Sequence, residues 1–407
     1  MSGWMSFVLK EKLKGLKGRL KVWNKKEYGG MEERVEKLVK DISMLDEKGE
    51  EGSLEEVEVR LFKEKFEELW RLLKAKDALI VQRSRAKWLK EGDANSKFFH
   101  NCLKSRMSRN TIKALKVDDG WAVSPLDIRR KVVEYFTSHM EDIRWEQPRL
   151  DGVMFAQISG EDNGYLVAPF TMPELVAPFT MPELEAVVRE SDSSKSPGPD
   201  GFNFAFVKKI WYLIKHEVRI MFDQFHVDEV PPRCMLAYFV TLIPKVSSPF
   251  ELKDFCPISL LGSLYKLLAK VLARRLAGVM NSIISSTQSA FLKGRNLVDG
   301  VLVVNELVGY PRKVKKECLI FKVDFEKAYD SVDWGFLEYM LYRVGMSEKW
   351  VAWMKACVCG GSKSILVNGC PTEEISIHRG LKQGDPLAPF LFLLVAEGFS
   401  GLMRKAT

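Results

Sequence analysis

One carboxylate in this chain stands where an apolar run ends. In the segment FKVDFEKAYDSVDW, residues 321–334, the run Leu319–Val323 leads directly to Asp324. We expect a β-strand over CLIFKVDF, residues 318–325, which places Asp324 at a strand end. A carboxylate there could bind a divalent cation, but hard cations need several oxygen ligands. Asp324 would therefore need partner ligands elsewhere in the chain.

A second set of candidate residues is a block of positive charge. From Arg83 to Lys116, ten Lys and Arg stand against two acids, an excess of eight that equals the net charge of +8 of the whole chain. Basic side chains can hold phosphates while aromatic side chains, which are interleaved here, stack on bases. The block predicts a nucleic-acid contact, and a solvated helical face with core aromatics is the alternative. The candidate contacts are Arg83, Arg85, Lys87, Lys97, Lys104, Arg106 and Arg109.

The composition indicates an intracellular chain with sizeable hydrophobic cores. The 407 residues are 46% hydrophobic, and the seven cysteines are scattered, which favours reduced thiols over a disulfide framework. Cys357, Cys359 and Cys370 lack the usual zinc spacing, so core packing is favoured over a zinc site. No secretory leader is visible, and the most apolar stretch, PLAPFLFLLVA, is about half the length that spans a bilayer. We therefore expect no membrane segment.

Changes in composition divide the chain into three regions. Residues 1–82 are charge-rich with apolar residues at helical spacing, and we expect a helical extension. Residues 83–185 form a basic linker in which the nonamer LVAPFTMPE occurs twice in tandem, at 166–183. Two short identical copies do not make a repeat array, so we expect one copy to lead into a helix from Met181 and the other to form a surface bulge. Residues 186–407 alternate strand and helix patterns.

The third region supplies the elements that must position Asp324. The patterns predict strands over 238–245 and 318–325, helices over 259–280, 328–345 and 348–358, a basic loop feeding a helix over 288–308, a hairpin over 362–380, and a helix from Pro386. We expect Asp385 to cap the last helix, and Asp330 and Asp333 to act as caps or turn acceptors for the helix that follows Asp324.

Taken together, these segments resemble a known family. VDFEKAYDSVDW and RGLKQGDPLAPFLFLL are similar to the first two palm motifs of reverse transcriptases, most closely those of plant non-LTR retrotransposons of the long-interspersed-element type. SPGPDGFNFAFVKKIW, LIPK, DFCPISLLGSLYKLLAKVLARRL and QSAFLKGRNLVDG resemble the family's finger segments, in the family's order. WLKEGDANSKFFH resembles the linker between endonuclease and polymerase. The resemblance covers roughly residues 80–407. It implies an α+β fold with the fingers and part of the palm of a right-hand polymerase, preceded by the helical N-terminal extension.

The resemblance also implies a catalytic metal site. Polynucleotide synthesis is phosphoryl transfer assisted by two Mg²⁺ ions. Asp324 would be the catalytic carboxylate that binds both ions, and the carbonyl of Phe325 would help to hold the second. The implied partners are an RNA template, a DNA primer and a deoxynucleoside triphosphate.

Further residues are implied to contact nucleotide or nucleic acid. Lys245 would grip the triphosphate, and Tyr329 would crowd the 2′ position of the incoming nucleotide. Gln383 and Gly384 would form a turn that faces the nucleotide, since glycine lets the backbone come close to a ligand. Further candidates for contact with backbone phosphate are Lys293 and Arg295 of the finger loop and Arg379 and Lys382 of the second motif. For Arg379 and Lys382, solvent exposure is the alternative.

Two departures from the family's pattern indicate loss of activity. In the family an Arg before PIS joins the Lys of IPK on the triphosphate; here that position is Cys256, and a thiol cannot replace a bidentate guanidinium. The family's other metal-binding carboxylates lie in an ADD-like hairpin after the second motif, whereas DD occurs in this chain only at Asp118–Asp119. The chain reaches Thr407 before such a hairpin or a thumb, so we expect a fragment with little or no polymerisation activity. The alternatives are a nucleic-acid-binding remnant and an inert relic.

Overall fold

The chain divides into a helical unit and a unit of mixed helix and sheet. The computed structural model describes residues 4–406 except 53, 85–95, 118–119, 142–148, 169–180, 316, 318–319, 321 and 326. One unit comprises Leu13–Lys113, and the other comprises Met1–Lys12 and Ala114–Thr407. The domain boundaries predicted after residues 82 and 185 were drawn from sequence composition and family segments, not from the compactness of the fold, and they stay predictions.

The smaller unit is helical. It contains most of α1 (Met5–Tyr28), followed by α2 (Met31–Glu51), α3 (Glu56–Ser84) and α4 (Ser96–Asn110). Ion pairs such as Lys65–Asp41 (2.7 Å) and Lys76–Glu32 (3.3 Å) join α2 and α3 as an antiparallel pair. Surface ion pairs of this kind contribute little each. The helical character agrees with the extension expected for residues 1–82.

The larger unit is built on a mixed five-stranded sheet. β3 (Tyr238–Pro244) pairs antiparallel with β4 (Phe255–Leu260) and parallel with β5 (Ser362–Val367). β6 (Cys370–Pro371) and β7 (Ile375–Ser376) both pair antiparallel with β5, which gives the order β4-β3-β5-β6 with β7 beside β5. A separate small hairpin joins β1 (Leu115–Val117) to β2 (Gly120–Ala122).

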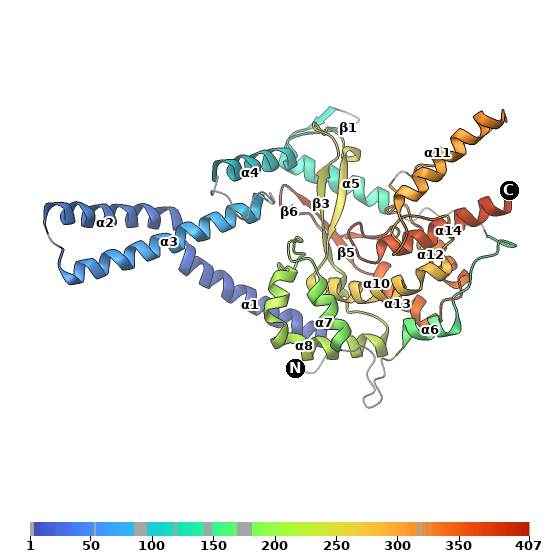
Figure 1. The fold of residues 1–407 in the computed structure, drawn as a ribbon, viewed down its shortest axis with the longest axis horizontal. Coiled ribbons are helices and arrows are strands. Elements are labelled where there is room, and N and C mark those ends of the chain that lie inside the picture. The colour runs from blue at the N-terminus through green and yellow to red at the C-terminus, as the bar shows by residue number, and fades with distance from the viewer. Residues whose placement is uncertain are drawn as a thin grey trace. The chain divides into compact units, whose positions relative to one another are not determined.

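Helices cover this sheet and make most of the core (Figure 1). The central one is α10, whose apolar side chains Leu272, Leu276 and Met280 are fully buried. Within the described residues, no helix combines the length and apolar character that a bilayer crossing needs. The helices of this unit, with one short 3-10 turn η1 (Leu252–Asp254), are α5 (Pro125–Met140), α6 (Gly160–Val167), α7 (Met181–Glu190), α8 (Phe204–Asp228), α9 (Arg233–Leu236), α10 (Ser263–Ile283), α11 (Leu297–Val314), α12 (Trp334–Arg343), α13 (Glu348–Val358) and α14 (Ala388–Ala406).

Most elements of the third region form where the sequence predicted them. The strand from Tyr238, the helix Glu348–Val358, the hairpin around β5 and the helix from Met181 are confirmed. The long helix predicted over 259–280 begins at Ser263, and the helix predicted from Pro386 begins at Ala388. Both copies of the nonamer, at 166–174 and 175–183, fall largely outside the described residues, so the surface bulge stays a prediction.

The strand predicted before Asp324 is wrong in this structure. The described residues of that segment, 320 and 322–325, lie in no strand. A strand needs a neighbouring backbone to satisfy its N–H and C=O groups, and local sequence does not supply one. The helix predicted from Ala328 begins only at Trp334, because the side chain of Asp333 accepts a hydrogen bond from the N–H of Phe336 (2.7 Å) and caps the helix there.

A buried ion pair joins α6, α7 and α10. The guanidinium of Arg275, whose side chain is 0% exposed, donates to both carboxylate oxygens of Glu183 (3.2 and 3.3 Å) and to the carbonyl of Leu166 (3.2 Å). Burial lowers the pKa of Arg275 and raises the pKa of Glu183, so for both groups desolvation outweighs the attraction between them. Removing one partner would leave the other charge buried alone.

We expect Arg275→Met to lower the free energy of unfolding by about 3–5 kcal/mol, because it leaves the Glu183 carboxylate without its cation. Urea denaturation followed by circular dichroism measures the change. Arg274→Met is the matched control: the exposed pair of Arg274 with Glu190 (3.1 Å) should contribute less than about 1 kcal/mol. Equal losses for the two variants would contradict the importance of burial.

Candidate functional site

A positively charged cavity lies where α5, η1, β4 and the segment 327–330 meet. Its volume is about 150 Å³, less than the roughly 300–1,000 Å³ of pockets that enclose a drug-sized ligand. Such a cavity fits one end of a larger ligand. Three lysines and one carboxylate are among the lining residues, which are Tyr135, Phe136, His139, Met140, Lys245, Leu252, Lys253, Phe255, Cys256, Pro257, Lys327, Ala328, Tyr329, Asp330 and Gln383.

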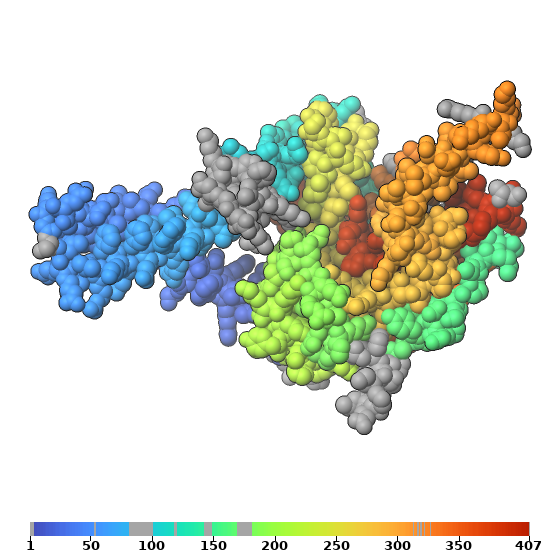
Figure 2. Space-filling model, in the orientation of Figure 1, coloured from blue at the N-terminus to red at the C-terminus, as the bar shows by residue number. Residues whose placement is uncertain are grey.

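This cavity brings together residues that the sequence assigned to a nucleotide. Lys245, Tyr329 and Gln383 all line it, although they come from three distant segments of the chain. Cys256, the position where the family has an arginine, lines the same cavity. In the space-filling view, one red part of the C-terminal region shows between yellow and orange parts of this unit (Figure 2).

The turn at Gln383 is fixed against β4. The N–H of Ser259 donates to the carbonyl of Gln383 (2.8 Å), and the side-chain amide nitrogen of Gln383 lies 3.2 Å from the thiol sulfur of Cys256. Gly384 has φ +100°, and a Cβ there would lie 3.4 Å from the carbonyl oxygen of Ser259. Only glycine adopts this backbone conformation readily, so Gly384 allows the turn to approach β4.

Lys245 lies at the end of β3 with its side chain exposed. Its backbone N–H donates to the carbonyl of Asp254 (2.8 Å), and its Nζ donates to the carbonyl of Lys253 (3.3 Å). These contacts fix the loop at the side of the cavity that Lys245 and Lys253 line, where the Lys253 ammonium also pairs with the carboxylate of Glu251. A ligand with several negative charges would suit that side.

Tyr329 and Phe325 pack against α14. The ring of Tyr329 lies 5.4 Å from that of Phe392, and burial raises the pKa of its phenol. Phe325 meets Phe392 and Phe399 edge to face at 6.0 and 6.3 Å. Both aromatic side chains therefore orient the segment that contains Asp324.

Asp324 itself is exposed and is not among the residues that line the cavity. Within the part of the chain that the structure describes, no three His, Cys, Asp or Glu side chains lie together so as to hold a metal ion. A hard divalent cation needs more oxygen ligands than Asp324 and a carbonyl of Phe325 provide. The residues present do not fit a complete two-ion site.

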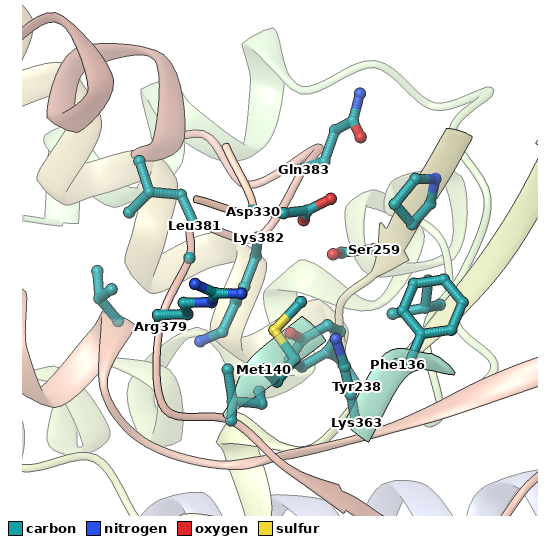
Figure 3. Close-up of a pocket in the computed structure, with 15 residues that line it drawn as sticks. Phe136, Met140, Tyr238, Ser259, Asp330, Lys363, Arg379, Leu381, Lys382 and Gln383 are labelled. Atoms are coloured by element: carbon teal, nitrogen blue, oxygen red, sulfur yellow. The ribbon is translucent and has the colours of Figure 1, made fainter. Parts of the chain in front are cut away.

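A second, narrower cavity adjoins the first (Figure 3). The two share Phe136, Met140, Pro257, Asp330 and Gln383. Asp330, which the sequence predicted to be a cap or turn acceptor, is half-buried and lines this cavity together with the buried Lys363 of β5. Burial raises the pKa of Asp330 and lowers that of Lys363 to about 8, and the attraction between the two charges opposes both shifts.

Below the Gln383 turn lies a buried polar network. Lys382 donates to the carbonyl of Cys357 (2.6 Å) and lies with its Nζ 4.6 Å from the ring centre of Tyr265. The Tyr265 hydroxyl donates to Oδ2 of Asp385 (2.7 Å), whose Oδ1 accepts from the N–H of Leu387 (2.9 Å) just ahead of α14. Burial lowers the pKa of Lys382 and raises that of Asp385. Lys382 is therefore a core residue in this structure, not a surface contact for phosphate.

The other predicted nucleic-acid contacts have different surroundings. Arg379 donates twice to the carbonyl of His139 (2.8 and 2.6 Å), and Arg295 donates to the carbonyls of Ser285, Gln288 and Ile284, so both hold backbone in place. Lys293 is exposed beside Arg295. The exposed basic residues of α4 are Lys104, Arg106 and Arg109. Arg85, Lys87 and the side chains of Arg83 and Lys97 lie outside the described part of the structure.

Sequence reasoning missed the contribution of α5. Tyr135, Phe136 and His139 line the cavity, and the Lys327 Nζ lies 3.1 Å from the Tyr135 hydroxyl and 2.7 Å from His139 Nε2. In the sequence, α5 has only the apolar spacing of an ordinary packed helix, so no local signal distinguishes these residues.

Part of the chain matches a known family. Residues 243–407 match the family model described as reverse transcriptase (RNA-dependent DNA polymerase). That region contains Lys245, Tyr329 and Gln383, and α5 lies outside it.

Curated proteins show the same relationship. The chain is 27% identical over 332 residues to the transposon TX1 uncharacterized 149 kDa protein of Xenopus laevis, which covers 79% of this chain and 24% of that protein. It is 32% identical over 204 residues to the retrovirus-related Pol polyprotein from type-2 retrotransposable element R2DM of Drosophila melanogaster, covering 50% of this chain and 19% of the relative. It is 30% identical over 207 residues to the retrovirus-related Pol polyprotein from type-1 retrotransposable element R2 of Popillia japonica, covering 50% of this chain and 28% of the relative.

The chain thus spans between 19% and 28% of the length of these relatives. Residues 243–407 are thus similar to reverse transcriptases, and the curated relatives include Pol polyproteins of retrotransposable elements.

The buried network below the turn yields a prediction with a defined pH dependence. We expect Lys382→Met to lower the free energy of unfolding by about 3–5 kcal/mol at pH 8, because Asp385 is left buried without its cation. Burial raises the folded-state pKa of Asp385 above its unfolded value. Its contribution to stability is therefore present in acid and lost as the pH rises, so the loss relative to the unaltered protein should be smaller at pH 5.

Urea denaturation at both pH values measures this difference. Lys355→Met is the control, since its exposed pair with Glu338 (2.8 Å) should change stability by less than about 1 kcal/mol at either pH. A loss for Lys382→Met that is independent of pH would contradict the assignment.

Proposed function

We propose that residues 186–407 form the fingers and part of the palm of a non-LTR retrotransposon reverse transcriptase, of the plant long-interspersed-element type that the motifs resemble. In this proposal, the charged cavity binds the triphosphate end of a deoxynucleoside triphosphate. The observation that supports it best is the convergence of Lys245, Tyr329 and Gln383 on one cavity. Homology to Pol proteins supports RNA template and DNA primer as the other partners.

The side chains would divide the work of binding. Lys245 and Lys253, on one side of the cavity, would attract and orient phosphate oxygens. Tyr329, held against Phe392, would press against the sugar, and the amide of Gln383 would hydrogen-bond to sugar or template. Such contacts position a substrate for phosphoryl transfer, which depends mainly on positioning and charge stabilisation.

The chemical step needs charge that these residues do not supply. The family generally uses divalent metal ions, and we propose Mg²⁺ as the ion, but the described residues do not fit a complete site. Asp324 is the carboxylate we assign to that role. We therefore propose that this polypeptide binds nucleotide and template but by itself incorporates little or no nucleotide into DNA.

Two measurements on the full chain test the proposal. We expect dTTP to bind more tightly than dTMP, and Lys245→Met to weaken dTTP binding about tenfold, as for loss of a charge-assisted hydrogen bond. We also expect no extension of a DNA primer on an RNA template with Mg²⁺ and dNTPs. Absence of dTTP binding would contradict the assignment of the cavity as a nucleotide site. Templated, Mg²⁺-dependent incorporation of nucleotide would contradict only the predicted inactivity.

A second candidate function is nucleic-acid binding without catalysis. It is supported by the exposed basic side chains of α4, Lys104, Arg106 and Arg109. Protein cations that neutralise phosphates release counterions, so the logarithm of the binding constant falls linearly with the logarithm of salt concentration.

We expect the triple variant Lys104→Gln, Arg106→Gln, Arg109→Gln to weaken binding of an RNA hairpin and to reduce the salt slope by about two to three. Fluorescence anisotropy at several salt concentrations measures both quantities. A control that removes the same charge from α1, Lys21→Gln, Lys25→Gln, Lys26→Gln, should leave the slope unchanged. Equal slopes for the α4 variant and the unaltered protein would exclude α4 as a phosphate contact.

A further inference from the structure

Lys327 occupies an unusual position at the cavity. Its backbone has φ +52°, in the left-handed region that non-glycine residues seldom adopt, and its carbonyl accepts from the N–H of Ser331 (3.1 Å). Such a conformation persists when surrounding contacts hold it in place, and it often marks a functional segment. The conformation starts the turn that carries Tyr329 and Asp330 into the two cavities.

Two neutral groups of α5 are among the partners of the Lys327 ammonium. Nζ donates to the Tyr135 hydroxyl (3.1 Å) and to Nε2 of His139 (2.7 Å), and it lies 5.4 Å from the centre of the Tyr135 ring. The other ring nitrogen of His139, Nδ1, lies 2.8 Å from the carbonyl of Tyr135 and donates to it. Burial lowers the pKa of His139, in agreement with a neutral imidazole that accepts from the lysine.

Neutral acceptors orient an ammonium group without cancelling its charge. A carboxylate partner would compete with an anionic ligand, whereas a hydroxyl and an imidazole do not. The carboxylate that lines the cavity, Asp330, has Lys363 as its strongest charge partner, ahead of Lys327. Two contacts of the Lys327 ammonium at the cavity are thus with neutral groups.

The helix that holds Lys327 is itself fixed to the site. Arg379 donates twice to the carbonyl of His139, and the Phe136 side chain lies under the ammonium of Lys363, 5.2 Å from ring centre to Nζ. These contacts join α5 to the loop that leads into the Gln383 turn and to β5. Because α5 lies outside residues 243–407, the family match does not account for it.

We propose that α5 forms a wall of the triphosphate pocket and that Tyr135 and His139 position the ammonium of Lys327 to bind phosphate oxygens. Cys256, which stands where the family has an arginine, supplies no cation for this binding. This inference rests on the proposed function, from which it takes the triphosphate as ligand. Tyr135 and His139 are positioning residues, and Lys327 is the binding residue.

Binding of inorganic tripolyphosphate and of dTTP to the full chain tests the inference, because the first probe needs no sugar or base. We expect Lys327→Met to weaken both ligands about tenfold and Lys327→Arg to restore most of the affinity. Lys209→Met, which removes an exposed lysine of α8, should change neither affinity. Thermal unfolding of each variant verifies that it is folded.

Two further variants separate positioning from charge. His139→Leu leaves Lys327 in place but removes its acceptor, so affinity should fall several-fold, whereas His139→Gln keeps an acceptor and should retain more affinity. Cys256→Arg introduces the guanidinium that the cavity lacks. In that background, the loss caused by Lys327→Met should shrink from about tenfold to less than about threefold.

The outcomes distinguish this inference from the proposed function. If Lys327→Met binds tripolyphosphate as tightly as the unaltered protein, the inference is overturned, while dTTP binding that still depends on Lys245 would leave the proposed function standing. If the unaltered protein binds neither probe, both are overturned. If tripolyphosphate binding depends on Lys327 but dTTP binds no better than tripolyphosphate, the inference holds and the nucleotide assignment fails.

Discussion

A buried cation and a buried carboxylate on either side of the Gln383–Gly384 turn constrain the whole site. Lys382 and Asp385 are both buried, and Tyr265 of α10 lies between them, while the carbonyl of Cys357 on α13 accepts from the lysine. Because core helices fix both ends of the turn, the turn can only meet the edge of β4, where Ser259 holds it. The core therefore fixes this wall of the cavity. Removing the partner of either buried charge would disturb both the core and the wall.

The opposite wall is held by turns instead of a sheet. The N–H groups of Leu381 and Gly380 donate to the carbonyls of Tyr329 and Val332, each at 2.7 Å. Gly380 has φ +88°, and a Cβ there would lie 2.8 Å from the carbonyl oxygen of Asp330, so glycine permits this close approach. Tyr329 and Lys327 are thus fixed relative to Gln383, whereas Asp324, a few residues earlier, is exposed. This difference accounts for our proposal that binding groups are in place while the chemical step lacks its full set of ligands.

The sequence predicted the features that depend on local pattern and failed where distant packing decides. The strand from Tyr238 and the helix Glu348–Val358 follow from apolar spacing, and Asp333 acts as a cap as its position suggested. The sequence made Lys382 a candidate phosphate contact, with solvent exposure as the alternative, and only the fold brings Tyr265 and Cys357 against its ammonium. Burial was not expected, since lysine is seldom fully buried.

Two other features were also beyond the reach of local pattern. A strand before Asp324 requires a pairing partner that the sequence pattern does not reveal. The contact of Lys327 with Tyr135 joins residues 192 positions apart, so it could not be inferred from spacing.

Hydrogen–deuterium exchange of the full chain with and without dTTP tests the central claim, that this cavity is a nucleotide pocket, most directly. The account predicts slower exchange in peptides that cover α5, β4, residues 327–332 and residues 379–385, with no change in α8 or in the small unit. Protection at all of the cavity segments together would support it. Protection elsewhere, or none at saturating dTTP, would contradict it.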